Sequence, residues 1–362
     1  MFGGIENSIF NLSLGLQRNG TRVTVYSSHL GSNDEEVGGI STIRNQEALP
    51  AELPPGNAER DHAIKVHLIR HRNRIAADIA SVIHERDIDL ILACDPLWGI
   101  VQFCETWKVD PCPTVLSFHV PNQRELLELA GASPYLFYRC VSPNLKEEID
   151  KSVRLRDVEV IPNSFDPARF KPSVLPSEES KILFCNSRID PAKGIDFLLH
   201  AFALFQRRIG GFELWLCAGQ SPFGDRHAAI EGVKEEIRNL GLTRSVRMLG
   251  NLQWHEMPDY IRQSFAVVLP TLYESFGRAA MEALACGVPV VATRTGNLPY
   301  LIGDAGMLVE SASPQALYEG LLKLYEHPEL RCEYRLRGPV QVAIYNNTSV
   351  AASFIAAAKR RL

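Results

Sequence analysis

Two glutamates lie close together in one short segment, and both could accept hydrogen bonds from a polar ligand. The segment from Leu269 to Thr293 reads LPTLYESFGRAAMEALACGVPVVAT, with seven residues between Glu274 and Glu282. Glu274 precedes a predicted helix, and Glu282 lies about two turns inside it, roughly 10 Å along the axis at about 1.5 Å per residue. Between the two carboxylates lie the N–H groups of Ser275, Phe276 and Gly277.

The predicted helix start could bind an anion, because N–H groups without intrahelical partners and the helix dipole both favour negative charge there. A diphosphate would suit this place. A nucleotide sugar is a diphosphate with a hydroxyl-rich ring on each side, so one carboxylate could serve the sugar and the other the ribose. The alternative is an ordinary amphipathic helix with solvated glutamates, and the spacing alone does not decide between them.

The elements that must position these residues form a strand, a helix and a second strand. An apolar strand is expected at 265–269, and the helix restarts around Phe276 with Ser275 as its N-cap. Gly287 and Pro289 end the helix before a second strand at 288–292.

Two cations are expected at the end of another strand, 181–185. Arg188 and Lys193 flank a turn, and Gly194 follows it. In open parallel sheets, ligands bind outside the carboxyl ends of the strands. With the helix start, the two cations could neutralise a diphosphate leaving group without a metal. A simple solvated turn is the alternative.

His119 closes the predicted strand 114–118, again at a carboxyl end. A histidine there could donate to a substrate hydroxyl or phosphate, although a lone histidine is also common in a purely structural place.

Other clusters of charged residues are weaker candidates for a functional site. Asp87 and Asp89 resemble a metal-binding DxD pair but precede a strand, and His67 and His71 lack a convincing third ligand. No metal and no other cofactor are therefore expected. Two basic groups could meet an acceptor phosphate or an anionic membrane, though solvated faces are favoured: Arg70, His71, Arg72 and Arg74, and then Arg331, Arg335 and Arg337.

Composition narrows the class of protein. A chain of 362 residues is longer than a single hydrophobic core usually supports, so two domains are expected. With 46% hydrophobic and 22% charged residues, the composition is that of a globular protein. A net charge of −4 argues against general nucleic-acid binding. Eight scattered cysteines without a CxxC pair look like buried thiols of a reducing compartment. No membrane span or signal peptide is evident, so we expect a cytoplasmic protein, with peripheral contact at the inner face of the membrane as an option.

Alternating strands and helices predict two α/β domains with parallel sheets that face each other across a cleft. The expected domains are 1–165, joined by the C-terminal helix at 340–362, and 181–339, with a linker at 166–180. A long loop with one short strand is expected at 30–61. A strand would normally feed the Gly3-Gly4 turn, and the sequence has no residues to form it, so we expect either that the sequence begins late or that the first domain lacks this strand. Further elements are expected as strands at 22–27, 90–94, 137–141, 158–161, 212–218, 245–249 and 306–309, and as helices at 63–86, 195–208, 226–240, 314–326 and 349–360.

These residues resemble the retaining GT-B glycosyltransferases of family 4 over nearly the whole chain. The segment around Glu274 is similar to the family's E-x-F-G-x-x-x-x-E motif, followed by ACG-x-PVVAT. Arg188 and Lys193-Gly194 match the family's diphosphate-binding pair. Gly3-Gly4 match its N-domain glycine loop, His119 its cleft histidine, and the segment 160–163 the entry to the linker.

The resemblance implies sugar transfer from a nucleotide diphosphate sugar to a glycan, lipid-linked or small-molecule acceptor, with retention and without a metal. It places Glu274 at the sugar and Glu282 at the ribose. Arg188, Lys193 and the amides at 275–277 would stabilise the leaving diphosphate, and the acceptor would attack from the front face. The alternatives are a truncated non-catalytic binder of nucleotide sugars or of a partner, and a nucleotide-sugar epimerase. Four residues depart from the family pattern, and these departures concern the identity of the donor sugar more than the class of reaction. They are Ser164, Ser187, Asn297 and Tyr300.

Overall fold

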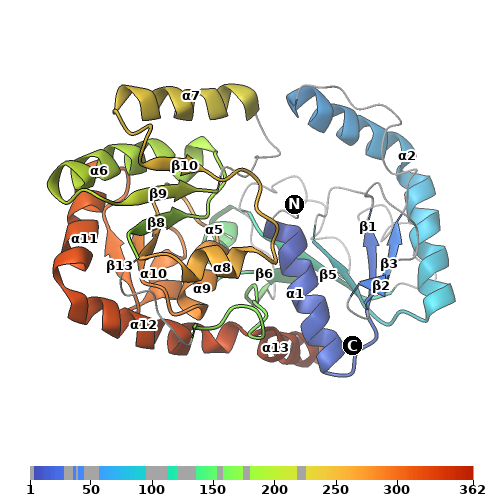
Figure 1. Cartoon of the computed structure of the whole chain (residues 1–362). Coiled ribbons are helices and arrows are strands. Elements are labelled where there is room, and N and C mark those ends of the chain that lie inside the picture. The colour runs from blue at the N-terminus through green and yellow to red at the C-terminus, as the bar shows by residue number, and fades with distance from the viewer. Residues whose placement is uncertain are drawn as a thin grey trace. The chain divides into compact units, whose positions relative to one another are not determined.

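The computed structural model describes residues 4–27, 36–37, 40–44, 57–94, 112–120, 136–152, 158–173, 180–217 and 226–361. The chain divides into two compact units (Figure 1). Unit 1 comprises Met1–Gly4 and Phe165–Asn346, and unit 2 comprises Ile5–Ser164 and Asn347–Leu362. The predicted domain bounds and the linker at 166–180 stay predictions.

Unit 1 is built on a parallel sheet whose described strands follow the order β10-β9-β8-β11-β12-β13. The chain leaves β8 on one side for β9 and β10, and then crosses to the other side of β8 to form β11. The loops after β8 and β11 therefore flank the point where the strand order reverses, which is where open α/β sheets bind ligands. The strands are β8 (Ile182–Cys185), β9 (Glu213–Leu216), β10 (Val246–Met248), β11 (Ala266–Leu269), β12 (Val290–Thr293) and β13 (Met307–Val309).

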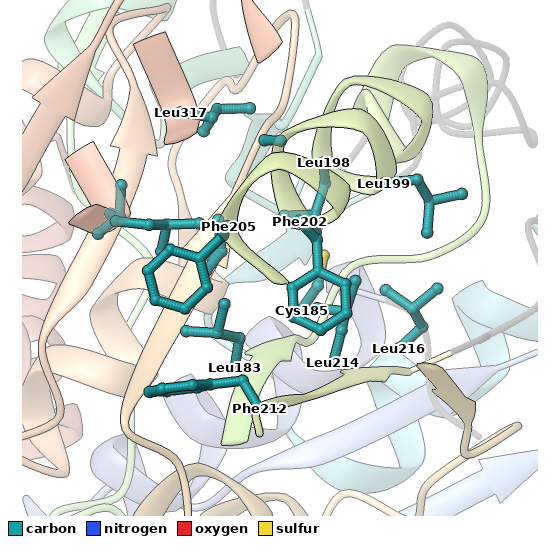
Figure 2. Close-up of a cluster of buried hydrophobic side chains, with 14 of the residues drawn as sticks. Leu183, Cys185, Leu198, Leu199, Phe202, Phe205, Phe212, Leu214, Leu216 and Leu317 are labelled. Carbon is teal, nitrogen blue, oxygen red and sulfur yellow. The ribbon is translucent and has the colours of Figure 1, made fainter. Parts of the chain in front are cut away.

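Helices cover both faces of this sheet, which explains why its central strands are apolar at successive positions. Alternate strand residues such as Leu183 and Leu214 pack with Phe202 and Leu317 in a buried core (Figure 2). On this face lie α6 (Ile195–Arg208), α7 (Arg226–Asn239) and α11 (Pro314–Glu326). Helix α9 (Arg278–Ala285) packs on β11 and β12, together with α8 (Met257–Arg262), α10 (Leu298–Ile302) and α12 (Pro328–Val342). Two short 3₁₀ helices are η2 (Pro191–Lys193) and η3 (Ala343–Tyr345).

Unit 2 contains a parallel sheet of the order β4-β5-β6-β7 and a separate small sheet of the order β1-β3-β2 in its described part. The strands are β1 (Thr24–Ser27), β2 (Glu36–Val37), β3 (Ile40–Arg44), β4 (Ile91–Ala93), β5 (Thr114–Phe118), β6 (Leu136–Cys140) and β7 (Val158–Val160). The helices are α1 (Gly4–Arg18), α2 (Asn57–Arg86), α5 (Pro143–Ser152) and α13 (Asn347–Lys359).

Helices α1 and α13 of unit 2 pack closely at Gly15. A Cβ atom at this position would lie 2.0 Å from the carbonyl oxygen of Asn347, so only glycine allows the approach. Beside this contact, Leu12, Val350 and Phe354 share a core with Val115 of β5. The C-terminal helix is thus part of unit 2, although it follows unit 1 in the sequence.

Several predicted elements have the predicted bounds, namely β5, α6 and α11. The prediction of a loop at 30–61 with one short strand is wrong in part, because β2 and β3 lie inside it and α2 begins at Asn57. Helix α12 was not predicted, because it contains Pro339 and leaves Leu336 and Val340 exposed, so its apolar residues do not mark a buried face.

The cysteines of the described part form no disulfide, and all of them are buried except Cys332. The expectation of buried thiols is therefore wrong for Cys332, since it lies on the exposed side of α12. Among the described helices, none combines the length and the apolar character that a membrane crossing requires.

Candidate functional site

The loop after β11 leads into α9, whose first residue is Arg278. Gly277 is the N-cap in the left-handed region, with φ of 101°, and a Cβ atom there would lie 2.7 Å from the Leu298 side chain. The prediction of Ser275 as the N-cap is therefore wrong. Glu282 is the fifth helical residue, about one turn or 6 Å along the axis rather than two turns. The first-turn N–H groups of α9 still point back toward the loop that carries Glu274.

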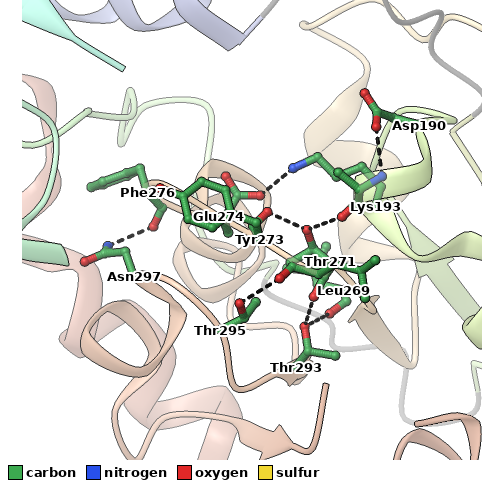
Figure 3. A network of polar contacts seen from close by, with 12 residues as sticks. Asp190, Lys193, Leu269, Thr271, Tyr273, Glu274, Phe276, Thr293, Thr295 and Asn297 are labelled. Atoms are coloured by element: carbon green, nitrogen blue, oxygen red, sulfur yellow. Dashed lines mark hydrogen bonds and ion pairs between the residues drawn. The ribbon is translucent and has the colours of Figure 1, made fainter. Parts of the chain in front are cut away.

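Lys193 and Glu274 form an ion pair between the loops after β8 and β11 (Figure 3). Lys193 Nζ lies 2.7 Å from Glu274 Oε2, and the two side chains are 19% and 23% exposed. The pair is therefore partly shielded from water and open enough for a ligand to reach. Two residues that the sequence places far apart thus meet at the reversal point of the sheet.

The turn that carries Lys193 is shaped by its own residues. The Asp190 side chain accepts a hydrogen bond of 2.9 Å from the Ala192 N–H at the start of η2, and Gly194 ends η2 in the left-handed region with φ of 64°. A Cβ atom on Gly194 would lie 2.2 Å from the carbonyl oxygen of Pro270. Only glycine leaves room for this contact, so Gly194 allows the loop after β8 to lie close to the loop after β11.

Backbone hydrogen bonds join the same two loops. The Leu272 N–H donates to the carbonyl of Ala192 over 2.8 Å, and Thr271 Oγ1 lies 3.1 Å from the same oxygen. The hydroxyl of Thr293, at the end of β12, donates to the carbonyl of Thr271. The loop after β11 is therefore bonded on both sides.

A third loop, after β12, holds the backbone of the Glu274 segment. The Asn297 N–H donates to the carbonyl of Glu274 over 2.9 Å, and Asn297 Nδ2 donates to the carbonyl of Phe276 over 2.9 Å (Figure 3). Gly296 lies so close that a Cβ atom would stand 2.1 Å from the Glu274 carbonyl oxygen. In the sequence, Asn297 stands out only as a departure from the family pattern, so its supporting role was missed.

Glu282 is buried and pairs with Arg278 one turn before it in α9. Arg278 Nη2 lies 2.7 Å from Glu282 Oε1, and the side chains are 14% and 9% exposed. The second carboxylate oxygen of Glu282 has no hydrogen-bond partner among the described residues. Sequence reasoning missed Arg278, which the i,i+4 spacing to Glu282 could have revealed.

The remaining predicted residue of unit 1, Arg188, lies after β8 and is half-buried. In the described ranges it forms no hydrogen bond or ion pair, in contrast to Lys193. Its guanidinium thus has donors to offer to an anion in the same loop. Of the predicted glycine loop, Gly3 lies outside the described residues and Gly4 begins α1.

His119 of unit 2 directly follows β5, as predicted, and is buried with 6% of its surface exposed. Its Nε2 atom lies 3.1 Å from the hydroxyl oxygen of Ser117. The histidine is therefore held by a neighbour on its own strand rather than pointing loosely into solvent.

The weaker metal candidates belong to unit 2. No group of three or more His, Cys, Asp or Glu side chains suited to a metal occurs in the part of the chain that is described. Asp87 is exposed and lies 3.5 Å from Arg22, while the ring centroids of His67 and His71 lie 4.2 Å apart with the rings tilted by 36°.

The order of the strands and the loops at the reversal point define a class, the GT-B fold of two Rossmann-like units. Solved structures with a similar fold cover almost the full chain. Sucrose-phosphate synthase from Thermosynechococcus elongatus has a TM-score of 0.82 at 19% identity, covering 99% of this chain and 93% of that one. HepE of Anabaena in complex with UDP-glucose has a TM-score of 0.78 at 18% identity, covering 99% and 97%. At these identities the likeness concerns the fold.

Sequence comparison identifies the family. The model described as Glycosyltransferase Family 4 matches residues 2–169, and the one described as Glycosyl transferases group 1 matches residues 167–339. The chain belongs to family 4 of the glycosyltransferases, and the suspected resemblance is confirmed.

Curated relatives include D-inositol 3-phosphate glycosyltransferases. That of Corynebacterium jeikeium is 33% identical over 189 residues, which are 48% of this chain and 45% of the relative. That of Acidothermus cellulolyticus is 31% identical over 228 residues, which are 61% of this chain and 47% of the relative. The chain thus spans about half the length of the curated relatives it matches.

Proposed function

We propose that this protein transfers a sugar from a nucleoside diphosphate sugar to a hydroxyl-bearing acceptor, with retention and without a metal. The observation that carries the proposal is the Lys193–Glu274 ion pair of 2.7 Å at the reversal point of the unit 1 sheet, next to the N-terminus of α9. A cation, a helix start and a carboxylate in one place suit a ligand that joins a diphosphate to a hydroxyl-rich ring.

Different charged groups of the site bind different parts of the ligand. The diphosphate binds Lys193, Arg188 and the first-turn N–H groups of α9, which together replace a metal in stabilising the leaving group. Glu274 then accepts hydrogen bonds from hydroxyls of the donor sugar. Lys193 and Glu274 form an ion pair with each other in the described structure. A bound ligand must therefore replace this ion pair, with its diphosphate on Lys193 and its sugar hydroxyls on Glu274.

Glu282 is assigned to the ribose. Arg278 occupies its Oε1 atom, which leaves Oε2 for a ribose hydroxyl. The guanidinium also offsets the negative charge of a buried carboxylate near an anionic ligand. Arg278 therefore balances the charge of Glu282 beside a diphosphate.

The reaction follows from these roles and from the family. The acceptor hydroxyl attacks the anomeric carbon on the face that the diphosphate leaves, and a leaving phosphate oxygen takes the proton. His119 donates a hydrogen bond to the donor sugar. Because HepE was solved with UDP-glucose and the curated relatives are named for inositol 3-phosphate, UDP-sugars and a phosphorylated small acceptor are the first candidates. Glycan and lipid-linked acceptors, at the cytoplasmic face of the membrane, come next.

The test measures binding and transfer in turn. The protein is mixed with UDP-, GDP- and ADP-sugars, and the shift in melting temperature is recorded for each. Nucleotide release is then measured with and without inositol 3-phosphate or lipid and glycan acceptors, in the presence of EDTA. We expect one nucleotide sugar to raise the melting temperature and an acceptor to accelerate release.

Other results of this experiment would indicate a different function or mechanism. Binding without release by any acceptor would indicate a non-catalytic binder, and a changed sugar without an acceptor would indicate an epimerase. Activity that EDTA abolishes would contradict the metal-independent mechanism, and neither shift nor release would contradict the proposal as a whole.

A further inference from the structure

Arg139 is the largest fully buried side chain of the described residues, at 2% exposure in the middle of β6. Burial lowers the pKa of its guanidinium. No carboxylate in the described ranges forms an ion pair with it. A buried cation without an anionic partner is costly, so its hydrogen bonds are expected to serve a purpose.

Those hydrogen bonds run toward the carboxyl edge of the unit 2 sheet. Arg139 Nε donates to the carbonyl of Ile161 over 2.8 Å, and Nη2 donates to the carbonyl of Pro162 over 2.9 Å. The third nitrogen, Nη1, donates to the hydroxyl oxygen of Ser117 over 3.1 Å. Arg139 thus ties β5 to the segment that follows β7.

The register of the strands explains why Arg139 reaches Ser117 and, through it, His119. Ser117 of β5 and Arg139 of β6 are directly paired, so their side chains share one face of the sheet. His119 lies two residues beyond Ser117, and residues two apart point to the same side. The distance from Ser117 Oγ to His119 Nε2 is 3.1 Å. The three side chains form one chain of hydrogen bonds.

The direction of these bonds follows from what each group can donate. A guanidinium only donates, so Ser117 Oγ accepts from Arg139 and keeps its hydroxyl hydrogen for a second partner. His119 Nε2 lies within hydrogen-bond distance, and we infer that it accepts this hydrogen. With Nε2 as an acceptor, the neutral imidazole carries its proton on Nδ1. Any hydrogen bond that His119 donates to a ligand then comes from Nδ1.

We propose that Ser117 and Arg139 are positioning residues that hold His119 in the Nδ1–H tautomer and fix the orientation of its ring. The role of the donor hydrogen bond in sugar transfer rests on the function proposed above, whereas the tautomer itself does not. An Arg139–Ser117 pair at this place therefore sets which ring nitrogen of His119 carries the proton.

The test observes the tautomer directly. The protein is labelled with ¹⁵N-histidine, and a long-range ¹H–¹⁵N spectrum is recorded, with His119 assigned by the signal lost in His119→Gln. We expect Nδ1 to be protonated and Nε2 unprotonated in the wild type, and a mixture of tautomers in Ser117→Ala. A wild-type Nε2–H signal, or an unchanged tautomer in Ser117→Ala, would overturn the proposal.

A matched control separates this role from ordinary stability. Thr114 lies on the same strand, is fully buried, and donates its hydroxyl to the carbonyl of Cys112 over 3.1 Å. Thr114→Val removes a buried hydroxyl bond without touching the Arg139 chain, so the His119 signal is expected to stay as in the wild type. A change of equal size in Thr114→Val would show that any loosening of β5 moves the signal, and would contradict the positioning role.

Activity provides the second measurement once the donor is known. Ser117→Ala is expected to lower kcat for transfer about tenfold, with a smaller change in KM for the donor, because one orienting hydrogen bond is lost. Thr114→Val should retain the wild-type kcat. An unaltered kcat in Ser117→Ala alongside a shifted tautomer would remove His119 from the reaction while leaving the tautomer assignment intact.

Discussion

At the scale of single residues, four charged groups of the site are already paired before a ligand binds. Lys193 and Glu274 neutralise each other across two loops, and Arg278 and Glu282 do so within one helix. Removing one member of a pair leaves the other in a poorly solvated place. Single substitutions therefore report on the partner as well as on the residue that is changed.

The Lys193–Glu274 pair predicts coupled effects. Lys193→Ala alone should weaken nucleotide-sugar binding, and Glu274→Gln alone should mainly slow transfer. The double variant should lose less than the sum, with a coupling of about 1–2 kcal/mol in donor binding, because each residue holds the other in place. Calorimetric titration of the four proteins with the donor measures this. Additive losses would mean that the pair does not cooperate in binding.

The Arg278–Glu282 pair predicts a loss of stability as well as of binding. Arg278→Met should lower the free energy of unfolding by about 1–3 kcal/mol, since it leaves a buried carboxylate without its partner. Urea unfolding measures it. The control is Arg337→Met, which breaks a pair of the same 2.7 Å distance and i,i+4 spacing whose side chains are 52% and 39% exposed. That change should cost less than about 1 kcal/mol, and equal losses would contradict the role of burial.

At the scale of elements, three loops at the carboxyl edge of the unit 1 sheet hold one another. The loop after β11 is bonded to η2 on one side and to the loop after β12 on the other (Figure 3). Glycine makes both close approaches possible, at Gly194 and at Gly296. The position of Glu274 is therefore a property of three loops and not of its own loop.

This arrangement predicts that Gly296→Ala damages the site. Gly296 has φ of 51°, and its Cβ atom would clash with the Glu274 carbonyl, so the loop must shift. We expect a stability loss above about 2 kcal/mol, from strain and overpacking combined, and little shift of the melting temperature by the nucleotide sugar.

Gly250→Ala is the control for Gly296→Ala. Gly250 has φ of 73°, but a Cβ atom added at this position would have nothing within 4 Å. This variant should show only the backbone strain of about 1–2 kcal/mol and should keep the ligand-induced shift. If both variants respond alike to the nucleotide sugar, the close approach at Gly296 is not what positions Glu274.

At the scale of the whole molecule, both units bury thiols in their cores. Burial raises the pKa of Cys140 in unit 2 to about 11 and that of Cys185 in unit 1 to about 11. The same cause raises the pKa of Cys286 to about 12. Because the folded pKa exceeds the unfolded value, the neutral thiol of the folded state contributes stability that is complete below about pH 9 and is lost as the pH rises toward 11.

The free energy of unfolding should therefore fall between pH 9 and pH 11. Cys185 alone accounts for about 2–3 kcal/mol on this basis, because its pKa is raised from 9.0 to about 11. Urea unfolding at several pH values measures the slope, which should be shallower in Cys185→Ala and unchanged in Cys332→Ala, since Cys332 is exposed. The same slope in all three proteins would show that the buried thiol does not carry this effect.

Much of the fold could be predicted because local patterns agree with the final structure. Helices α6 and α11 have the bounds that their apolar periodicity predicts, and the motif around Glu274 identified the family. Helix α12 was missed because its exposed Leu336 and Val340 do not mark a buried face. Periodicity reports which side of an element is covered, so it fails where an apolar residue stays in water.

The sequence by itself determined residue types that the unit 1 site contains: two carboxylates, two cations and a glycine at a helix start. Tertiary structure alone decided the partners that come from different elements. Lys193 and Glu274 meet because β8 and β11 are neighbours in the sheet, and Arg139 reaches Ser117 because of the β5–β6 register. Sequence distance carries no information about such pairings, since sheet order and register join residues that the chain separates.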